Sequence, residues 1–452
     1  MARLHCRILL EIAICVVPAM TAVGFGSLYV GSRWLFGSTL VMLAYHFMNR
    51  KQLDTITLLL ALTPAMMLVR NAFYYSAPIL LSIGAVVLLL SRSHEQFGNL
   101  KKNKVLVGLL LFAILYWWLS FFKTASYSSN VRFLELSFTA ASVYLLANFR
   151  SYLATALAGL ALSSFCVAAS LLPYGDRLGI GQVEDVSIGN PITLGLSAAL
   201  VLLFAIVDKG RWLFVDEHPV WQALLALSAT ASLALSTSRG SWLVTMMGFI
   251  IIFLFNRGSR KVLVGTILAA VIMVATLLQT ARGPVIKHYF NSATAADESL
   301  AKRTTGRADQ WESFPRVFAD SPIWGFGPGS GKAVSLRYTL EGKPWHSLYL
   351  LIGTEAGLVG FVCLALFLGI LMRRGFLHWR SYGELGPLLA LFCFMFIGVS
   401  VSGIDAISGI FLGLAFLGND SPMRLRTVAR LKILNVSSGV DGSMQRPFEI
   451  YN

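Results

Sequence analysis

The side chains best suited to chemistry are a histidine and a carboxylate that follow one polar stretch. His346 lies where this stretch meets a long apolar run, in W-H-S-L-Y-L-L-I-G-T-E-A-G. A histidine can accept a proton near neutral pH, so this position suits a general base, and an interfacial side chain bonded to backbone is the alternative. Glu355 would lie about 13 Å further along the same helix. A carboxylate at that depth needs a partner, and we expect one of the outer arginines.

Single arginines at the ends of apolar runs predict a second kind of site. A guanidinium group near hydrocarbon is costly unless it snorkels, pairs or faces a polar cavity, so simple anchoring is the alternative to a function. Because guanidinium forks fit phosphate oxygens, the set predicts an outward-facing pocket for an anion. The set comprises Arg70, Arg132, Arg177 and Arg239 at the ends of apolar runs, and Arg303 and Arg307 in the polar segment.

The polar segment 281–345 is long enough to hold a subdomain and should carry the chemistry. Pro284 is expected to start a short interfacial element that turns Arg282, Lys287 and His288 to water. A helix is predicted from Thr305. Its apolar face would hold Ala308, Trp311, Phe314 and Phe318.

A glycine-rich turn follows this predicted helix, in S-P-I-W-G-F-G-P-G-S-G. Glycine permits backbone conformations that expose successive amides, and such amides can bind an anion. A tight loop with no ligand is the alternative. The glycines concerned are Gly325, Gly327, Gly329 and Gly331.

The elements that must position these residues are membrane spans. Hydrophobic residues make up 56% of the chain and charged residues 13%, which excludes a soluble globular domain. Apolar runs recur almost to the end, each long enough to cross the hydrocarbon core as a helix. We therefore predict an all-α integral membrane protein with about 12–14 transmembrane helices and one large polar loop.

Charge distribution sets the expected orientation and the division of the chain. Most of the 37 Lys and Arg residues fall in short segments that share one side when the N-terminus is cytoplasmic. Both termini are therefore placed in the cytoplasm and the polar segment on the far side. We expect a transmembrane bundle over 1–280, a loop subdomain with short helices over 281–345, transmembrane helices over 346–418 and a basic, flexible tail over 419–452.

Four stretches in order resemble the O-antigen ligase and O-antigen polymerase superfamily, polytopic glycosyltransferases of the GT-C type. They are R-L-G-I-G-Q-V-E-D-V-S-I-G-N-P-I-T-L-G at 177–195, S-T-S-R-G-S-W at 236–242, G-R-A-D-Q-W-E-S-F-P-R-V-F-A-D-S-P-I-W-G-F-G-P-G at 306–329 and H-S-L-Y-L-L-I-G-T-E-A-G-L-V-G at 346–360. The resemblance implies an undecaprenyl-diphosphate-linked glycan donor, a glycan or lipid A-core acceptor, and a periplasmic active site in the bacterial inner membrane. The family's usual H-N start of the last motif reads H-S here.

The resemblance also assigns roles to individual residues. Arg177 and Arg239 match the arginines expected to grip the lipid diphosphate, and Arg307 and His346 match catalytic positions. With Arg132 and Arg303 as further diphosphate ligands and Glu355 in support, His346 would deprotonate an acceptor hydroxyl that attacks the anomeric carbon with inversion. Trp311, Trp324 and Trp345 would stack on sugar rings, with core packing as their alternative.

Several alternatives stay open at this stage. A slight preference for polymerase over ligase rests on how many superfamily members polymerise. A transporter or flippase of an anionic lipid-linked solute is the alternative from another class, but it would predict internal repeats, and the sequence lacks them. Acidic residues in the polar segment are not spaced as paired ligands, so we expect metal-independent chemistry without a cofactor. No nucleic-acid partner is expected.

Overall fold

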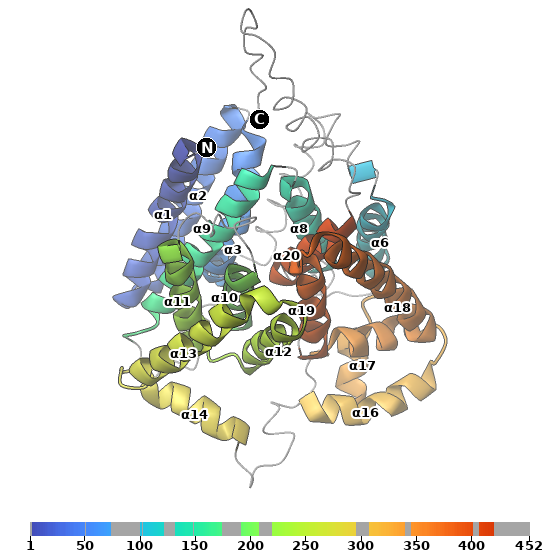
Figure 1. The fold of residues 1–452 in the computed structure, drawn as a ribbon. Coiled ribbons are helices and arrows are strands. Elements are labelled where there is room, and N and C mark those ends of the chain that lie inside the picture. The colour runs from blue at the N-terminus through green and yellow to red at the C-terminus, as the bar shows by residue number, and fades with distance from the viewer. Residues whose placement is uncertain are drawn as a thin grey trace, which may run out of the picture. The chain divides into compact units, whose positions relative to one another are not determined.

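The computed structural model describes most of the chain as helices (Figure 1). The described residues are 2–49, 51–73, 100–101, 103–121, 132–147, 149–173, 191–207, 219–294, 307–339, 345–400 and 406–419. Met1–Gly418 forms one compact unit, and Asn419–Asn452 is a separate one. The predicted tail therefore lies outside the described residues apart from Asn419, and the division of the chain stays a prediction.

Every regular element within the described ranges is a helix, which confirms the all-α class. The helices of the apolar bundle are α1 (Ala2–Gly24), α2 (Leu28–Met48), α3 (Gln52–Phe73), α6 (Lys104–Phe121), α8 (Arg132–Ala147), α9 (Arg150–Ser170), α10 (Pro191–Val207), α11 (Pro219–Ser236), α12 (Arg239–Phe255), α13 (Arg260–Leu277), α18 (Leu348–Tyr382), α19 (Gly386–Ser400) and α20 (Ala406–Ala415). The polar segment contains α14 (Gly283–Thr294), α16 (Arg307–Asp320) and α17 (Gly331–Tyr338).

Four of the described helical segments are long and apolar enough to cross a membrane, and shorter apolar helices accompany them. The four are Cys6–Gly24, Ser151–Ser170, Arg257–Leu277 and Leu348–Tyr382. With the composition, this makes the chain an integral membrane protein. The total of 12–14 spans stays a prediction, because part of the chain lies outside the described residues.

Two apolar runs of the sequence, over 8–30 and 346–372, predict span boundaries that the structure corrects. The first run predicts one continuous span, but α1 ends at Gly24 and α2 begins at Leu28 after a turn in which Gly26 has φ +86°. The apolar run over 346–372 continues as helix to Tyr382, and Gly383 ends it in the left-handed conformation. Local backbone conformation, rather than loss of apolar character, sets both boundaries.

The interior of the bundle is built around α10, in which every residue from Thr193 to Val207 is buried. A helix that is apolar on all sides fits only inside such a bundle. Small residues allow close contacts elsewhere. Gly409 and Gly413 are four residues apart on α20, and a Cβ on either would lie within 2.8 Å of α8 atoms. This spacing of small residues is typical of membrane helices in contact.

The short helices α14, α16 and α17 lie at the same end of the compact unit, α14 beneath α13 and the other two beneath α18 (Figure 1). The polar segment thus contains the short helices that its sequence predicts. Lys287 and His288 are exposed on α14 as expected. The expectation for Arg282 is wrong, since its side chain is 0% exposed.

The predicted apolar face of α16 is also partly wrong. The buried positions are Gln310 and Val317, while Trp311 is 43% exposed. Phe314 and Phe318 lie against Phe361 of α18, with ring centroids 6.3 and 6.0 Å away. The helix is therefore rotated so that a polar residue, Gln310, faces the interior.

The glycine-rich turn is fastened to a kink in α18. Gly357 interrupts the helix with φ 57° and ψ −146°. Across the kink, the Phe326 amide donates to the Thr354 carbonyl at 2.8 Å, and the Leu358 amide donates to the Pro322 carbonyl at 2.8 Å. The turn thus supplies the hydrogen bonds that the kinked helix cannot make internally.

We predict that Gly357→Ala destabilises the protein by about 1–3 kcal/mol, because this backbone conformation is nearly restricted to glycine. A Cβ there would also lie 2.6 Å from the Ile323 carbonyl oxygen. The melting temperature of the detergent-solubilised protein measures this effect. Gly369→Ala on the same helix is the control, since a Cβ there meets nothing within 4 Å. Equal melting temperatures for the two variants would contradict the prediction.

Candidate functional site

The first turn of α16 and the start of α18 are joined by one hydrogen bond. The backbone N–H of His346 donates to Oε1 of Gln310 at 2.9 Å, and Gln310 is buried. Gln310 lies one helical turn after Arg307, the first residue of α16. The structure therefore brings two residues that the sequence places in the catalytic site, Arg307 and His346, to the same region.

The backbone that carries His346 is held on both sides. Trp345 is buried in a small core with Val317 and Leu350. The Ser347 hydroxyl donates to the Gly398 carbonyl at 3.0 Å, and the Tyr349 hydroxyl donates to the Met395 carbonyl at 2.9 Å. Both acceptors lie on α19, so α16 and α19 together fix the half-buried His346.

Arg239 opens α12 directly after a tight turn from α11. Within this turn Thr237 has φ 51°, a conformation that is uncommon for a residue other than glycine. Ser238 caps α12, and its hydroxyl oxygen accepts hydrogen bonds from the amide of Ser241 at 3.4 Å and from its hydroxyl at 2.8 Å. Serines at these positions therefore build the turn from which Arg239 emerges.

Arg239 and Arg307 affect each other electrostatically. Burial lowers the pKa of the Arg307 guanidinium, and the positive charge of Arg239 lowers it further. Nε of Arg307 is buried and has no hydrogen-bond partner among the described residues. Each arginine also begins a helix, where the helix dipole adds positive potential. Two cations held in this way form a site that an anion would complete.

Within the part of the chain that the structure describes, the partners of Glu355 are a hydroxyl and an amide rather than the arginine that the sequence predicts, and the side chains of Arg70, Arg132 and Arg177 lie outside that part. The Glu355 carboxylate is buried and accepts a hydrogen bond from the Tyr116 hydroxyl at 2.5 Å and one from the Gly331 amide at 3.0 Å. These partners satisfy the carboxylate without a cation. Glu355 therefore ties together α6, α17 and α18, and its role is structural support.

Amides of the glycine-rich turn are hydrogen-bonded within the protein. The amides of Phe326 and Gly327 donate to carbonyls of α18, and the Gly331 amide donates to Glu355. These amides bind α18 rather than a ligand, so the prediction of an anion-binding loop is wrong.

The three tryptophans separate into two groups. Trp345 is 2% exposed and belongs to the core, so the expectation that it stacks on sugar is wrong. Trp311 is 43% exposed and Trp324 is 73% exposed. Both could reach a glycan, and their role stays a prediction.

The remaining predicted ligands are not placed by the structure. Arg177 and Arg303 lie outside the described residues. Arg132 begins α8 and Arg70 lies in α3, but their side chains are also outside the description. Among the described residues, no group of three His, Cys, Asp or Glu side chains is placed to hold a metal ion. Metal-independent chemistry stays a prediction.

Sequence reasoning missed two residues that support the site. Gln310 binds the backbone of His346, and Tyr116 binds Glu355 from 239 positions away in the sequence. Both contacts join distant segments, so no local pattern in the sequence indicates them.

An O-antigen ligase family model matches residues 223–365, which contain Arg239, Arg307 and His346. The chain is 24% identical over 343 residues to an uncharacterized protein of Haemophilus influenzae, covering 70% of this chain and 83% of that protein. It is 24% identical over 371 residues to an O-antigen ligase of Salmonella typhimurium, covering 77% of this chain and 84% of that protein.

We predict that Tyr116→Phe destabilises the protein by about 1–3 kcal/mol, because it removes a hydroxyl that satisfies a buried carboxylate. The expected result is a lower melting temperature in detergent. Tyr29→Phe is the control, since Tyr29 is largely exposed on α2. If Tyr116→Phe melts like the wild type, the bond to Glu355 contributes nothing measurable.

Proposed function

We propose that this chain, a member of the O-antigen ligase and polymerase superfamily, transfers a glycan from undecaprenyl diphosphate to an acceptor hydroxyl. A lipid-linked glycan transferase role is what the family match and the Salmonella relative support. The observation that carries the proposal is that two cations, Arg239 at the start of α12 and Arg307 at the start of α16, lie close enough to repel each other, while Gln310 of α16 binds the backbone of His346.

The arginine pair suits the leaving group of this reaction. When the bond between the anomeric carbon and the diphosphate oxygen breaks, its electron pair stays on the diphosphate, where negative charge develops. Arg239 and Arg307 would stabilise that charge, and the anion would relieve the repulsion between them. Their fixed positions at two helix starts avoid reorganisation during the reaction.

His346 would supply the matching general base. The acceptor hydroxyl oxygen attacks the anomeric carbon from the face opposite the diphosphate, and its proton passes to His346. The configuration at that carbon inverts, and no metal ion takes part. Gln310 would act as a positioning residue, because it holds the His346 backbone at 2.9 Å.

The proposal also includes further ligand residues and the side of the membrane on which the reaction takes place. Arg132, Arg177 and Arg303 would add to the diphosphate site, and Trp311 and Trp324 would stack on the glycan. The reaction would take place on the periplasmic side of the inner membrane, with both termini in the cytoplasm.

The acceptor decides between the two reactions of the superfamily. The matched family model and the Salmonella relative both carry the ligase name. A ligase would use lipid A-core as the acceptor and a polymerase a second lipid-linked repeat unit, for which the sequence gives a slight preference, so the acceptor is left to the assay below. For the transporter alternative, no family match or relative of this kind provides support.

We predict that Arg307→Ala and Arg239→Ala each lower kcat/KM by about 100-fold or more, as losses of charge-stabilising groups do. The assay uses purified protein in lipid nanodiscs with an undecaprenyl-diphosphate-linked glycan, and offers lipid A-core and a second lipid-linked unit separately. Product on lipid A-core identifies a ligase, and lengthened lipid-linked product identifies a polymerase.

Arg316→Ala is the matched control, because Arg316 is exposed on the same helix as Arg307. Normal turnover by both site variants would refute the diphosphate site. Absence of any transfer by the wild type, combined with movement of the lipid-linked glycan across the bilayer, would support the transporter instead.

We predict that His346→Ala lowers kcat by about 10²–10⁴-fold, the usual contribution of a general base. Gln310→Met should lower kcat less, because it leaves the imidazole in place but removes the acceptor for its backbone N–H. Gln310→Glu keeps an acceptor oxygen and should restore most of the activity. A Gln310→Met enzyme as active as the wild type would show that the hydrogen bond does not position His346.

A further inference from the structure

Three serines surround the turn from which Arg239 emerges, and the proposed transfer chemistry uses none of them. Ser236 ends α11, Ser238 caps α12, and Ser241 lies in the first turn of α12. Each of the three is at most 6% exposed. Because buried hydroxyl groups need hydrogen-bond partners, the bonds that these serines make indicate what holds the turn in place.

The three hydroxyl groups bond to one another and to the backbone of the turn. Ser241 Oγ donates to Ser238 Oγ at 2.8 Å, and the Ser238 amide donates to Ser236 Oγ at 3.3 Å. Ser236 Oγ in turn donates to the Leu233 carbonyl at 2.7 Å. A continuous chain of hydrogen bonds therefore runs from the first turn of α12 into α11. Arg239 stands between two of its members, Ser238 and Ser241.

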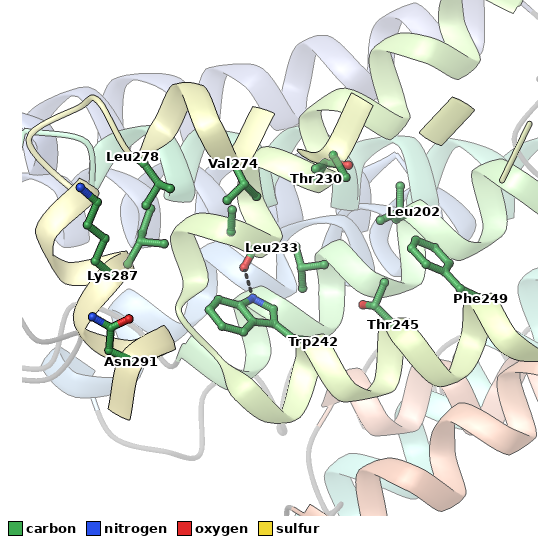
Figure 2. A pocket seen from close by; sticks show the side chains of 13 residues that line it. Leu202, Thr230, Leu233, Trp242, Thr245, Phe249, Val274, Leu278, Lys287 and Asn291 are labelled. Carbon is green, nitrogen blue, oxygen red and sulfur yellow. Dashed lines mark hydrogen bonds between the residues drawn. The ribbon is translucent and has the colours of Figure 1, made fainter. Parts of the chain in front are cut away.

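Trp242, the residue after Ser241, adds a second link between the two helices. Its Nε1 donates to the Leu233 carbonyl at 3.0 Å, at the wall of an apolar cavity, as Figure 2 shows. Its amide donates to the carbonyl of the cap residue Ser238 at 3.1 Å. The backbone of Arg239 thus has a defined place relative to α11.

Helix α10 comes close to the serine network at Gly195, the last residue of N-P-I-T-L-G. A Cβ on Gly195 would lie 2.5 Å from Ser241 Oγ and 2.7 Å from Ser236 Oγ, well inside van der Waals contact. Ser241 Oγ also lies 3.4 Å from the Ile192 carbonyl oxygen of α10. Glycine at position 195 therefore leaves the space that the two hydroxyl groups occupy.

A second close contact shows how α10 and α12 run. A Cβ on Gly248 of α12 would lie 2.5 Å from Leu203 Cδ2 of α10. The contacts proceed in the same order along both helices, from Gly195 to Leu203 and from Ser241 to Gly248, so α10 and α12 are parallel with their starts side by side. Arg239 therefore emerges where two helix N-termini, both of partial positive charge, lie together.

The repulsion between Arg239 and Arg307 makes a restraint at this point necessary. The two guanidinium groups lie close enough to affect each other electrostatically. Before an anion binds, this repulsion pushes the start of α12 away from α16. The serine network opposes that movement, and it does so with bonds that are already formed when the donor arrives.

We propose that Ser241 and Gly195 are positioning residues for Arg239. The Ser241 hydroxyl, in the space that Gly195 leaves, holds the start of α12 so that the guanidinium group reaches the diphosphate of the donor. Both residues are buried, so they act through Arg239 rather than by contact with the donor. The proposal rests on the proposed function and deepens it, because it names what holds one of the two cations in place.

The test combines two small substitutions with two matched controls. Ser241→Ala removes the hydroxyl group, and Gly195→Ala adds a methyl group where that hydroxyl lies. Ser232→Ala is the control for the first, because Ser232 is buried in α11 and its hydroxyl donates to a carbonyl of its own helix at 2.7 Å. Gly248→Ala is the control for the second, because its methyl group would meet α10 at 2.5 Å about two turns away from Arg239.

Transfer is measured with purified protein in nanodiscs and an undecaprenyl-diphosphate-linked glycan, with each variant made alone and in combination with Arg239→Ala. Ser241→Ala and Gly195→Ala should each lower kcat/KM by about tenfold or more, since a displacement of about 1 Å can cost that much, while the controls change it by less than about threefold. In the Arg239→Ala background the two substitutions should have no further effect, because their loss passes through Arg239.

A cryo-electron microscopy structure of Ser241→Ala with a bound antibody fragment provides a readout that needs no turnover. The start of α12 should move relative to α16 by about 1 Å, and it should not move in Ser232→Ala. If Gly195→Ala does not fold, Ser241→Ala decides alone, because it adds no volume.

Losses that multiply with the loss of Arg239→Ala would overturn the proposal, because a general structural defect acts independently of Arg239. Equal losses in the two controls would overturn it as well. If the wild type transfers nothing, the proposed function fails, and the structure alone tests the positioning: an unmoved start of α12 in Ser241→Ala would then reject it.

Discussion

The contact between the glycine-rich turn and the kink of α18 is the constraint on which the site depends. Gly325 and Gly357 both have positive φ, and a Cβ on Gly325 would lie 2.5 Å from the Ala356 nitrogen. This close approach lets the turn donate to the carbonyls that the kink frees, and it places α16 against α18. Gln310 can then reach the backbone of His346. Without the kink, the turn that follows α16 would lose these hydrogen bonds to α18.

The positive charges of the candidate site restrict the kind of ligand that it can bind. Arg239 and Arg307 are positive groups at helix starts, where the helix dipole adds to the unfavourable energy of a cation. An anion between the two guanidinium groups would lower that energy, and phosphate oxygens have the geometry that guanidinium groups bind. The diphosphate of the proposed donor would meet this requirement.

The candidate site could be predicted from the sequence where short motifs carry it. Arg239 stands in S-T-S-R-G-S-W, Arg307 begins a helix rich in aromatic residues, and His346 opens an apolar run. Partners that come from distant segments could not be predicted. Glu355 was expected to need an arginine because a buried carboxylate needs compensation, yet a tyrosine hydroxyl and a glycine amide provide it. Electrostatics predicts that a buried carboxylate needs a hydrogen-bond donor or a cation, but it does not predict which residue of the chain supplies it.

The sequence by itself determined the membrane class, the all-α architecture and most helix ranges, because about 20 consecutive apolar residues have no other stable arrangement in lipid. α10 begins and ends at Pro191 and Val207 as its apolar run predicts. Only the tertiary structure decided which face of α16 is buried, that Arg282 is buried, and that the glycine-rich turn binds α18. Hydrophobic periodicity fixes a face only when apolar burial dominates the energy. In the polar segment, hydrogen bonds between distant residues dominate instead.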